Sequence, residues 1–234
     1  MKVNIIYIRH GFSCANSVQY LGGFFQQLHR LVMLDPELTH YAKQQITKHR
    51  DQLKQSLHVD IVCSSTMIRA IQTAAYLFPK RKISILPYIK EKGRTAGNIP
   101  APWKEQMKKL TKTQRELLNP EWSQHQGRAV TDHQSFMTWL AQHLPDLLQH
   151  HHVSKHRKEV TIAIVMHSRY MQKSLTKGIL PKNVQGFLFQ YDWQLGHPKL
   201  EHERMVGVVV DGFETPDKET FRKAKGDRNC PTHV

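Results

Sequence analysis

A short apolar segment that ends in chemically active residues is the feature that most constrains this chain. Residues 3–8 are rich in β-branched side chains, and the run is too short for a helix, so it predicts a buried strand. The run stops at Arg9-His10-Gly11. In an open α/β sheet, the loops at the carboxyl ends of strands form the ligand crevice. We therefore expect His10 to lie at such a crevice, with Gly11 letting a ligand approach the backbone.

The same pattern of strand, polar loop and helix recurs along the chain. Further strands are predicted at residues 59–63, 83–86, 160–166, 186–191 and 204–210. The intervening helices are predicted over residues 39–57, from about 67 to 78, from 132 or 133 to about 148, and over 169–177. We expect the first to be capped by Thr39, the second by the run Ser64-Ser65-Thr66, and the third by Thr131 or Asp132. Strands that alternate with helices favour a mostly parallel sheet. The fold class is therefore a three-layer α/β/α architecture.

Length, charge and composition limit the number of domains, the kind of partner and the cellular location that we expect. The chain has 234 residues, which suits one domain, and a formal net charge of +15 predicts an anionic partner. No zinc-finger spacing and no aromatic-rich RNA-binding strand is present, so specific nucleic-acid recognition is not expected. No apolar run approaches the roughly 20 residues of a membrane span, and the first apolar run is too short for a signal peptide. The three widely spaced cysteines, Cys14, Cys63 and Cys230, are interpreted as reduced thiols of a cytoplasmic protein.

Three segments depart from the regular pattern. Residues 17–34 are aromatic and apolar and are interpreted either as an insertion over the ligand crevice or as a core helix. Residues 93–130 begin with a Gly/Pro-rich loop and continue into a basic helix over 103–121, which is interpreted as a solvated face or as a lid. Residues 212–234 are predicted to form a charged, poorly ordered tail after a domain that spans 1–211.

His150, His151 and His152 lie together near a predicted helix end, but no metal site is expected there, because consecutive side chains point in different directions.

The predicted strand ends carry a set of residues that suits phosphoryl transfer. Parallel strands end at one edge of a sheet, so two arginines, two histidines and a glutamate would converge there: Arg9, His10, Arg69, Glu91 and His167. Guanidinium groups bind phosphate oxygens bidentately. A neutral imidazole can accept the phosphoryl group, and a carboxylic acid can protonate the leaving oxygen and then activate water. Nearby arginines would keep the imidazole neutral, and bound phosphate would keep the glutamate protonated.

These residues also carry a family resemblance. Arg9-His10-Gly11 with Ser13 and Asn16 resembles the opening motif of the histidine phosphatase superfamily, whose fold is phosphoglycerate-mutase-like, and His167 resembles its late histidine. The segment 64–74, SSTMIRAIQTA, resembles its second motif, and the likeness covers roughly residues 1–211 except 17–34 and the lid. The resemblance implies that His10 is the phosphorylated nucleophile and Glu91 the proton donor. It implies a phosphate pocket built from Arg9, Arg69 and His167, with Asn16 and Ser168 as further contacts and no cofactor.

Several functional alternatives stay open at this stage. A phosphomonoesterase acting on a sugar phosphate, a nucleotide or a phosphopeptide is preferred. A phosphoglycerate mutase would use the same residues plus an anchor such as the lysines at 104–112, although Phe12 replaces a polar residue that the family usually has beside the nucleophile. A binding module would keep the pocket without turnover. Cys63-x5-Arg69 also fits the spacing of cysteine-dependent phosphatases, but Cys63 is better interpreted as a buried strand residue. Oligomeric state is not indicated by the sequence.

Overall fold

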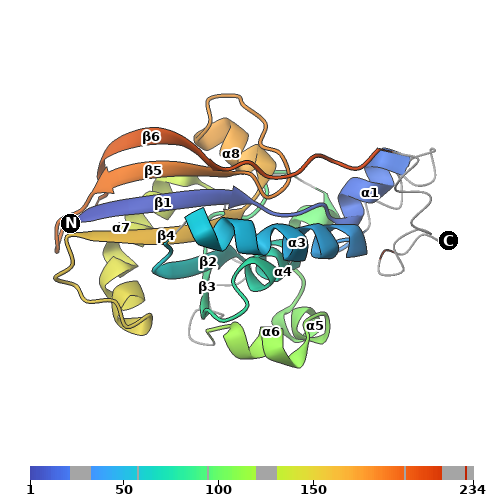
Figure 1. The fold of residues 1–234 in the computed structure, drawn as a ribbon, viewed down its shortest axis with the longest axis horizontal. Coiled ribbons are helices and arrows are strands. Elements are labelled where there is room, and N and C mark those ends of the chain that lie inside the picture. The colour runs from blue at the N-terminus through green and yellow to red at the C-terminus, as the bar shows by residue number, and fades with distance from the viewer. Residues whose placement is uncertain are drawn as a thin grey trace.

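The protein is built around one six-stranded sheet (Figure 1). The computed structural model describes residues 1–21, 33–56, 58–93, 95–119, 131–197, 199–217 and 230. The strand order is β3-β2-β4-β1-β5-β6, with the first four strands parallel and β5 and β6 added antiparallel at one edge. The strands are β1 (Lys2–Arg9), β2 (Ile61–Ser65), β3 (Ile83–Leu86), β4 (Glu159–Met166), β5 (Gly186–Asp192) and β6 (Glu201–Val210). The predicted mostly parallel sheet is confirmed.

Helices cover both faces of this sheet. They are α1 (Cys14–Leu21), α3 (His40–Ser56), α4 (Ile68–Leu77), α5 (Trp103–Lys108), α6 (Lys112–Leu117), α7 (His133–His150) and α8 (Ser168–Ser174), with the 3-10 turn η1 (Ala96–Asn98). Two buried clusters separate the layers: α7 and α8 pack on one face, and α3 and α4 on the other. The three-layer fold class is therefore confirmed.

Strand β1 serves both cores because its side chains alternate. Val3, Ile5 and Tyr7 belong to the cluster under α7, whereas Ile6 and Ile8 belong to the cluster under α3 and α4. The strand pairs in parallel with β4 in a register that sets Arg9 opposite Met166. The two strands therefore end side by side, and the residues that follow each of them become neighbours.

Two of the three predicted helix caps are confirmed. The Oγ1 of Thr39 accepts the backbone N–H of Ala42 at 3.1 Å before α3, and the carboxylate of Asp132 accepts from Ser135 at the start of α7. The cap predicted at Ser64-Ser65-Thr66 is wrong, because both serines extend β2 and α4 begins only at Ile68.

The basic segment over 103–121 is not one helix. Its described residues form α5 and α6, and η1 lies in the predicted loop before it. The segment divides because Thr111 starts a new helix with a capping box, in which its side chain and that of Gln114 satisfy each other's backbone N–H groups. Residues 120–130 of the predicted lid lie outside the described residues. So do residues 22–32 of the predicted insertion, whose first residues belong to α1. The limits of these segments stay predictions.

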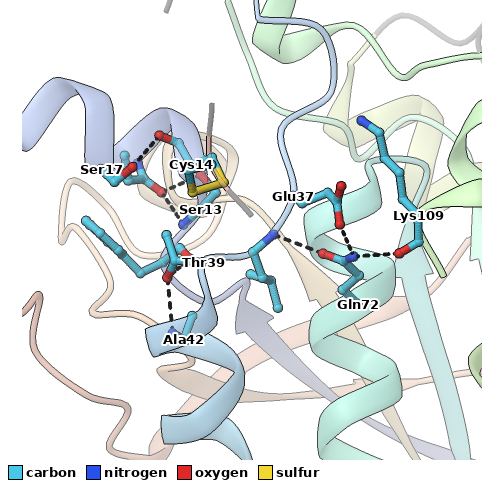
Figure 2. The surroundings of a disulfide bond; sticks show 12 residues. Ser13, Cys14, Ser17, Glu37, Thr39, Ala42, Gln72 and Lys109 are labelled. Atoms are coloured by element: carbon cyan, nitrogen blue, oxygen red, sulfur yellow. Dashed lines mark hydrogen bonds between the residues drawn. A yellow bond between two sulfur atoms is a disulfide. The ribbon is translucent and has the colours of Figure 1, made fainter. Parts of the chain in front are cut away.

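The interpretation of all three cysteines as reduced thiols is wrong. Cys14, the first residue of α1, forms a disulfide with Cys230, which is 216 positions away in the sequence. Figure 2 shows this bond beside Ser13, Ser17 and Thr39, and both cysteines are buried. Cys63 is the free thiol among the three, buried inside β2. The described residues of the predicted tail are held to the domain by this bond and by the Phe213 amide, which donates to the Asn183 carbonyl.

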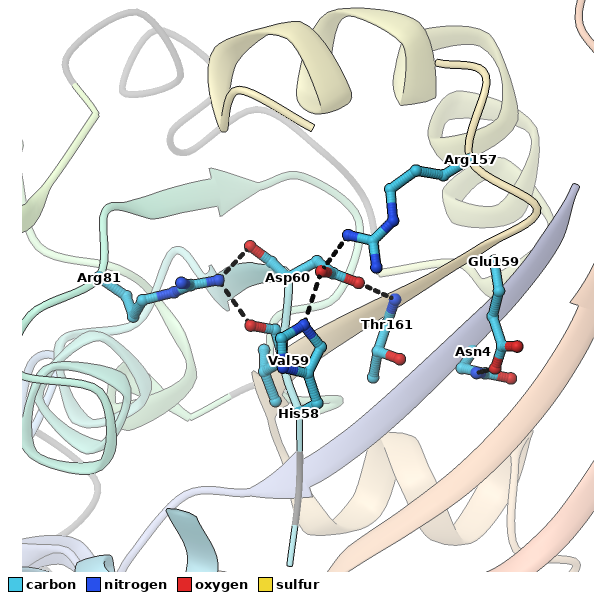
Figure 3. Close-up of polar contacts among 8 residues, drawn as sticks. All are labelled: Asn4, His58, Val59, Asp60, Arg81, Arg157, Glu159 and Thr161. Atoms are coloured by element: carbon cyan, nitrogen blue, oxygen red, sulfur yellow. Dashed lines mark hydrogen bonds and ion pairs between the residues drawn. The ribbon is translucent and has the colours of Figure 1, made fainter. Parts of the chain in front are cut away.

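A polar cluster joins the strands at the opposite, amino-terminal edge of the sheet (Figure 3). The buried carboxylate of Asp60 accepts from Arg157 at 2.6 Å, from His58 at 3.1 Å and from the Thr161 amide at 2.9 Å. The guanidinium of Arg81 donates to the carbonyls of Val59 and Asp60. The cluster therefore fixes the start of β2 against the start of β4.

The three consecutive histidines lie at this same edge, lining a cavity of about 980 Å³ with Asp60, Asp146 and the basic residues at 80–82. His151 is bonded to the Ser84 hydroxyl at 2.9 Å, and burial together with the charges of His150, Arg81 and His152 lowers its pKa to about 4. Among the described residues, the group of histidines and carboxylates close enough to share one metal ion lies elsewhere, at the carboxyl edge of the sheet. None of the helices in the described ranges is both long and apolar enough to cross a bilayer.

Candidate active site

Three side chains from distant parts of the sequence meet at the carboxyl edge of the sheet. His10 follows β1, Glu91 lies five residues past the end of β3, and His167 follows β4. One ring nitrogen of each histidine and one carboxylate oxygen lie within 4.8 Å of one another, and the two imidazole rings are 5.1 Å apart between centroids. All three side chains are at least nine-tenths buried. The convergence that the sequence predicts is therefore present.

His10 presents one ring nitrogen to the centre of this group. Its Nδ1 lies 2.6 Å from the carbonyl oxygen of Gly11, and because a carbonyl only accepts, Nδ1 carries the proton. Nε2 then keeps its lone pair, which accepts a hydrogen bond from Nε of Arg69 at 3.2 Å. Burial, with the charges of Arg69 and Arg9, lowers the pKa of His10 well below its ordinary value. The imidazole is therefore neutral at physiological pH.

Gly11 is packed closely against the side chains around the start of α3, and its role in ligand approach stays a prediction. A Cβ at this position would lie 3.0 Å from Cδ1 of Ile46 and 3.3 Å from Cδ2 of Leu38. The Gly11 amide donates to Oγ1 of Thr73 on α4 at 3.0 Å. The glycine thus lets the loop that carries His10 press against α3 and α4.

Two guanidinium groups surround His10 at different depths. Arg69 is buried on the first turn of α4, and its Nη1 donates to the carbonyl of Gly97 at 2.8 Å. Arg9 is half-buried and donates from Nη1 to the carbonyl of Pro181 at 2.6 Å. Burial lowers the pKa of Arg9 to about 10. The charge of Glu91 acts to raise this pKa, and the charge of Arg69 acts to lower it. Both side chains remain cationic at neutral pH, so this group favours an anion.

His167 is held by a residue that the sequence misassigns. Its Nε2 lies 2.6 Å from the hydroxyl of Ser65, the last residue of β2, while its buried Nδ1 contacts no hydrogen-bonding group of the described residues. Burial, with the charges of Arg69, His10 and Arg9, lowers the pKa of His167 well below its ordinary value. Ser65 therefore positions a second neutral imidazole instead of capping α4.

Glu91 is a buried carboxyl group beside both histidines. Burial raises its pKa above the ordinary value, whereas Arg69, a hydrogen bond from the Lys92 amide at 3.0 Å, Arg169 and Arg9 act in the opposite direction. A carboxyl group in this position can hold a proton at mildly acidic pH and release it to a neighbouring oxygen.

Comparison with known proteins identifies the family. The model of the histidine phosphatase superfamily (branch 1) matches residues 5–188, which include every predicted site residue. The chain belongs to the histidine phosphatase superfamily. No curated protein matches the sequence.

Solved structures show the same fold at low sequence identity. The structure of a mycobacterial protein described as hydrolase 2 is 15% identical, with a TM-score of 0.52 and coverage of 96% of this chain and 97% of that chain. A mycobacterial glucosyl-3-phosphoglycerate phosphatase is also 15% identical, with a TM-score of 0.52 and coverage of 88% of this chain and 98% of that chain. These likenesses agree with a histidine phosphatase fold over most of the chain.

Two residues predicted to bind phosphate in this member of the superfamily do not belong to the group around His10 and His167. The side-chain oxygen of Asn16 accepts from the amide of Ser13 at 3.1 Å and from its hydroxyl at 2.8 Å, so it orders the start of α1. The structure shows no contact between Asn16 and the histidine pair. Ser168 is the half-buried first residue of α8, next to His167, and its hydroxyl makes no hydrogen bond with the described residues. Their roles in phosphate binding stay predictions.

Asp35 is a positioning residue that sequence reasoning missed. Its buried carboxylate accepts from the amides of Ile68 and Ala101, both at 3.0 Å, and from the Gln106 side chain at 2.5 Å. It therefore ties the start of α4, which carries Arg69, to the segment around α5. The only local signal is Asp35-Pro36, which predicts a turn, and its partners lie 33 to 71 positions away.

The group His10, Glu91 and His167 also matches the donor types of a metal site. However, the Nε2 of His10 already accepts a hydrogen bond from cationic Arg69 at 3.2 Å. A metal ion there would face two arginines at close range, so the charge distribution favours a phosphate. The expectation of a metal-free site stays a prediction.

Proposed function

We propose that this protein is a phosphomonoester hydrolase that works through a phosphohistidine at His10. The observation that carries the proposal is the hydrogen bonding of His10: Nδ1 is committed to the Gly11 carbonyl, so the lone pair of Nε2 lies beside the Arg69 guanidinium. A buried, neutral imidazole with its lone pair directed at a cationic, anion-binding site is a suitable nucleophile for a phosphate ester.

In the first step, Nε2 of His10 attacks phosphorus while the bond from phosphorus to the leaving oxygen breaks. Glu91 donates its proton to that oxygen, so an alcohol departs and a carboxylate remains. In the second step, the Glu91 carboxylate takes a proton from water, whose oxygen attacks phosphorus as the P–N bond breaks. Inorganic phosphate leaves, and both residues return to their starting protonation states.

The remaining residues stabilise the transferring group. Arg69 lies beside the attacking nitrogen, Arg9 lies near both Arg69 and Glu91, and the imidazole of His167 lies beside that of His10. In both steps charge accumulates on the phosphoryl oxygens, and fixed cations and hydrogen-bond donors in a site shielded from water stabilise that charge.

The mutase alternative has weaker support. A mutase needs a second anchor for its phosphorylated intermediate, and the lid lysines were the candidates. Lys109 donates to the backbone carbonyl of Asp35 at 3.1 Å, and Lys108 forms an ion pair with Glu105 at 2.8 Å. Two of the lysines are thus committed to contacts within the protein.

The cysteine mechanism also has weaker support. The thiol of Cys63 is buried inside β2, and burial raises its pKa far above its ordinary value, so the reactive thiolate is not populated. Cys63 therefore offers a control position in a test of the nucleophile.

The test is to trap the intermediate. Wild-type protein mixed with a radiolabelled phosphate monoester and quenched in alkali, where phosphohistidine survives, should carry one label on the peptide that contains His10. His10→Ala should abolish both the label and phosphate release, while Cys63→Ser should retain both. Label on Cys63, or turnover by His10→Ala, would overturn the proposal. Incubation with 2- or 3-phosphoglycerate separates phosphate release from isomer interconversion.

A further inference from the structure

A third arginine lies near Glu91. Arg169 is the second residue of α8, two positions after His167, and its side chain is exposed. Its charge acts on Glu91, whose pKa it lowers against the effect of burial. Its guanidinium makes no hydrogen bond or ion pair with another residue in the described part of the chain. Unlike Arg9 and Arg69, which each donate to a backbone carbonyl, Arg169 is available to bind a ligand.

The loop after Glu91 brings the side chain of Asn98 and the guanidinium of Arg169 next to one glycine. Gly93 has a φ of +150°, which side-chain-bearing residues rarely adopt, and a Cβ there would collide with Nδ2 of Asn98 and lie 3.8 Å from Nη1 of Arg169. The amide nitrogen of Asn98 and the guanidinium of Arg169 thus lie next to the same glycine. Asn98 uses one of its two N–H groups on the Thr95 hydroxyl at 3.1 Å.

This glycine lies on the side of the site where the leaving group must be. Displacement at phosphorus places the leaving oxygen opposite the attacking nitrogen, so the alcohol lies away from His10 and close to its proton donor, Glu91. Gly93 is two residues beyond Glu91, and Arg69 donates to the carbonyl of Gly97, the residue before Asn98. A substituent on the alcohol would therefore extend from Glu91 toward Arg169.

We propose that Arg169, assisted by the side-chain amide of Asn98, binds a second anionic group on the leaving alcohol. The ligand chemistry is a carboxylate or a second phosphate, which a guanidinium binds through two parallel hydrogen bonds. This inference rests on the proposed function, because it assumes that the phosphate ester binds between His10 and Glu91.

The position of Arg169 gives the second anion a role in turnover as well as in binding. An unneutralised arginine beside Glu91 favours its carboxylate form, which cannot protonate a leaving oxygen. An anion bound to Arg169 offsets that charge. Substrates with a second anion should therefore have a higher kcat as well as a lower KM.

The experiment compares matched pairs of substrates. 3-Phosphoglycerate and glycerol 3-phosphate differ by a carboxylate in place of a CH2OH group, and propane-1,3-diol bisphosphate and its monophosphate differ by the second phosphate. Wild-type protein should prefer the doubly anionic member of at least one pair about tenfold or more in kcat/KM, and the pair that shows it identifies the anion. Arg169→Ala should reduce the preference to about twofold, chiefly by lowering kcat/KM for the doubly anionic member. Turnover of glycerol 3-phosphate should stay level or rise, because Glu91 loses the neighbouring charge that favours its carboxylate form, and Arg169→Lys should be intermediate.

Lys173 provides the matched control, because it is an exposed cation one turn further along α8. Lys173→Ala should keep the preference intact. An equal effect of the two alanine variants, an equal loss on both members of a pair, or no wild-type preference would overturn the subsite. These outcomes differ from failure of the proposed function, in which wild-type protein would release no phosphate from any ester or His10→Ala would remain active.

Discussion

The Nε atom of Arg69 lies 3.2 Å from Nε2 of His10, so a buried cation donates directly to the lone pair that we propose as nucleophile. The same guanidinium donates through Nη1 to the Gly97 carbonyl at 2.8 Å. One planar group thus orients the nucleophile and fixes the neighbouring loop. An ammonium group on a flexible stem cannot reproduce both bonds with the same geometry.

Arg69→Lys should therefore lower kcat/KM for phosphate esters about 100-fold or more, because a transition-state contact and the alignment of His10 are lost together. Steady-state kinetics with inorganic phosphate release as the readout measures this loss. Arg81→Lys is the matched control, since Arg81 also makes two hydrogen bonds, both to backbone carbonyls, but lies at the opposite edge of the sheet. The control should lose stability and keep kcat/KM within about threefold; equal kinetic losses in the two variants would contradict a specific role for Arg69.

Glu91 should set the alkaline limit of activity. Burial raises its pKa, and it must be protonated to assist the leaving group, so kcat should fall as pH rises through that pKa. His10 must be neutral, and burial with Arg69 and Arg9 lowers its pKa, so activity should persist at pH values well below 6.5. The pH optimum is therefore expected on the acidic side of neutrality, as measured by kcat across a constant-ionic-strength buffer series.

Glu91→Gln tests this assignment. It should lower kcat for an alkyl phosphate about 10²- to 10⁴-fold, with a much smaller loss for p-nitrophenyl phosphate, whose leaving group needs no proton. The alkaline limb should disappear from the p-nitrophenyl phosphate profile of the variant. Glu105→Gln, an exposed glutamate on α5, should change neither profile. An alkaline limb that survives in Glu91→Gln would assign that titration to another group.

The parts of the site that follow directly from strand ends could be predicted from the sequence. Runs such as residues 83–86 and 160–166 mark buried strands, and parallel pairing then brings His10 and His167 together without knowledge of any contact. Local rules also found the Thr39 and Asp132 caps, because the capping bond spans three residues.

Long-range contacts were not predictable in the same way. The bonds of Asp35 reach up to 71 positions along the chain, and nothing in the sequence around it indicates them. Ser65 sits where a cap is plausible, but β2 continues through it and turns its hydroxyl to His167. Three well-separated cysteines offer no spacing that pairs two of them, so Cys14 and Cys230 were interpreted by composition alone.

The disulfide should contribute substantially to stability. It closes a loop spanning 216 positions, and the entropy lost by the unfolded chain predicts about 5 kcal/mol. Reduction of wild-type protein should therefore lower its urea midpoint, and the double variant Cys14→Ser/Cys230→Ser should start at that lower midpoint and be insensitive to reductant. Thiol counting under denaturing, non-reducing conditions should find one reactive thiol, from Cys63. Three thiols in oxidised wild-type protein would contradict the pairing.

Asp60 should stabilise the fold in a pH-dependent way. Burial alone would raise its pKa, but the hydrogen bonds from the Thr161 amide, Arg157 and His58 outweigh burial and hold the pKa below its ordinary value. A carboxyl group whose folded-state pKa is depressed stabilises the protein above its unfolded-state pKa of about 3.9, and the contribution disappears as pH falls through the folded-state pKa. Asp60→Asn should thus lower the free energy of unfolding by about 2 kcal/mol at pH 7.

The comparison of urea unfolding at pH 7 and near pH 3 measures the sign of this effect. The difference between wild type and Asp60→Asn should shrink progressively below about pH 4, because the unfolded chain then binds a proton at Asp60 that the folded protein does not bind. Asp146→Asn is the matched control: Asp146 lines the same cavity but is exposed, so its replacement should change stability by less than about 0.5 kcal/mol at either pH. A difference for Asp60→Asn that stays constant or grows on acidification would show that the ionised carboxylate is not what ties the start of β2 to β4.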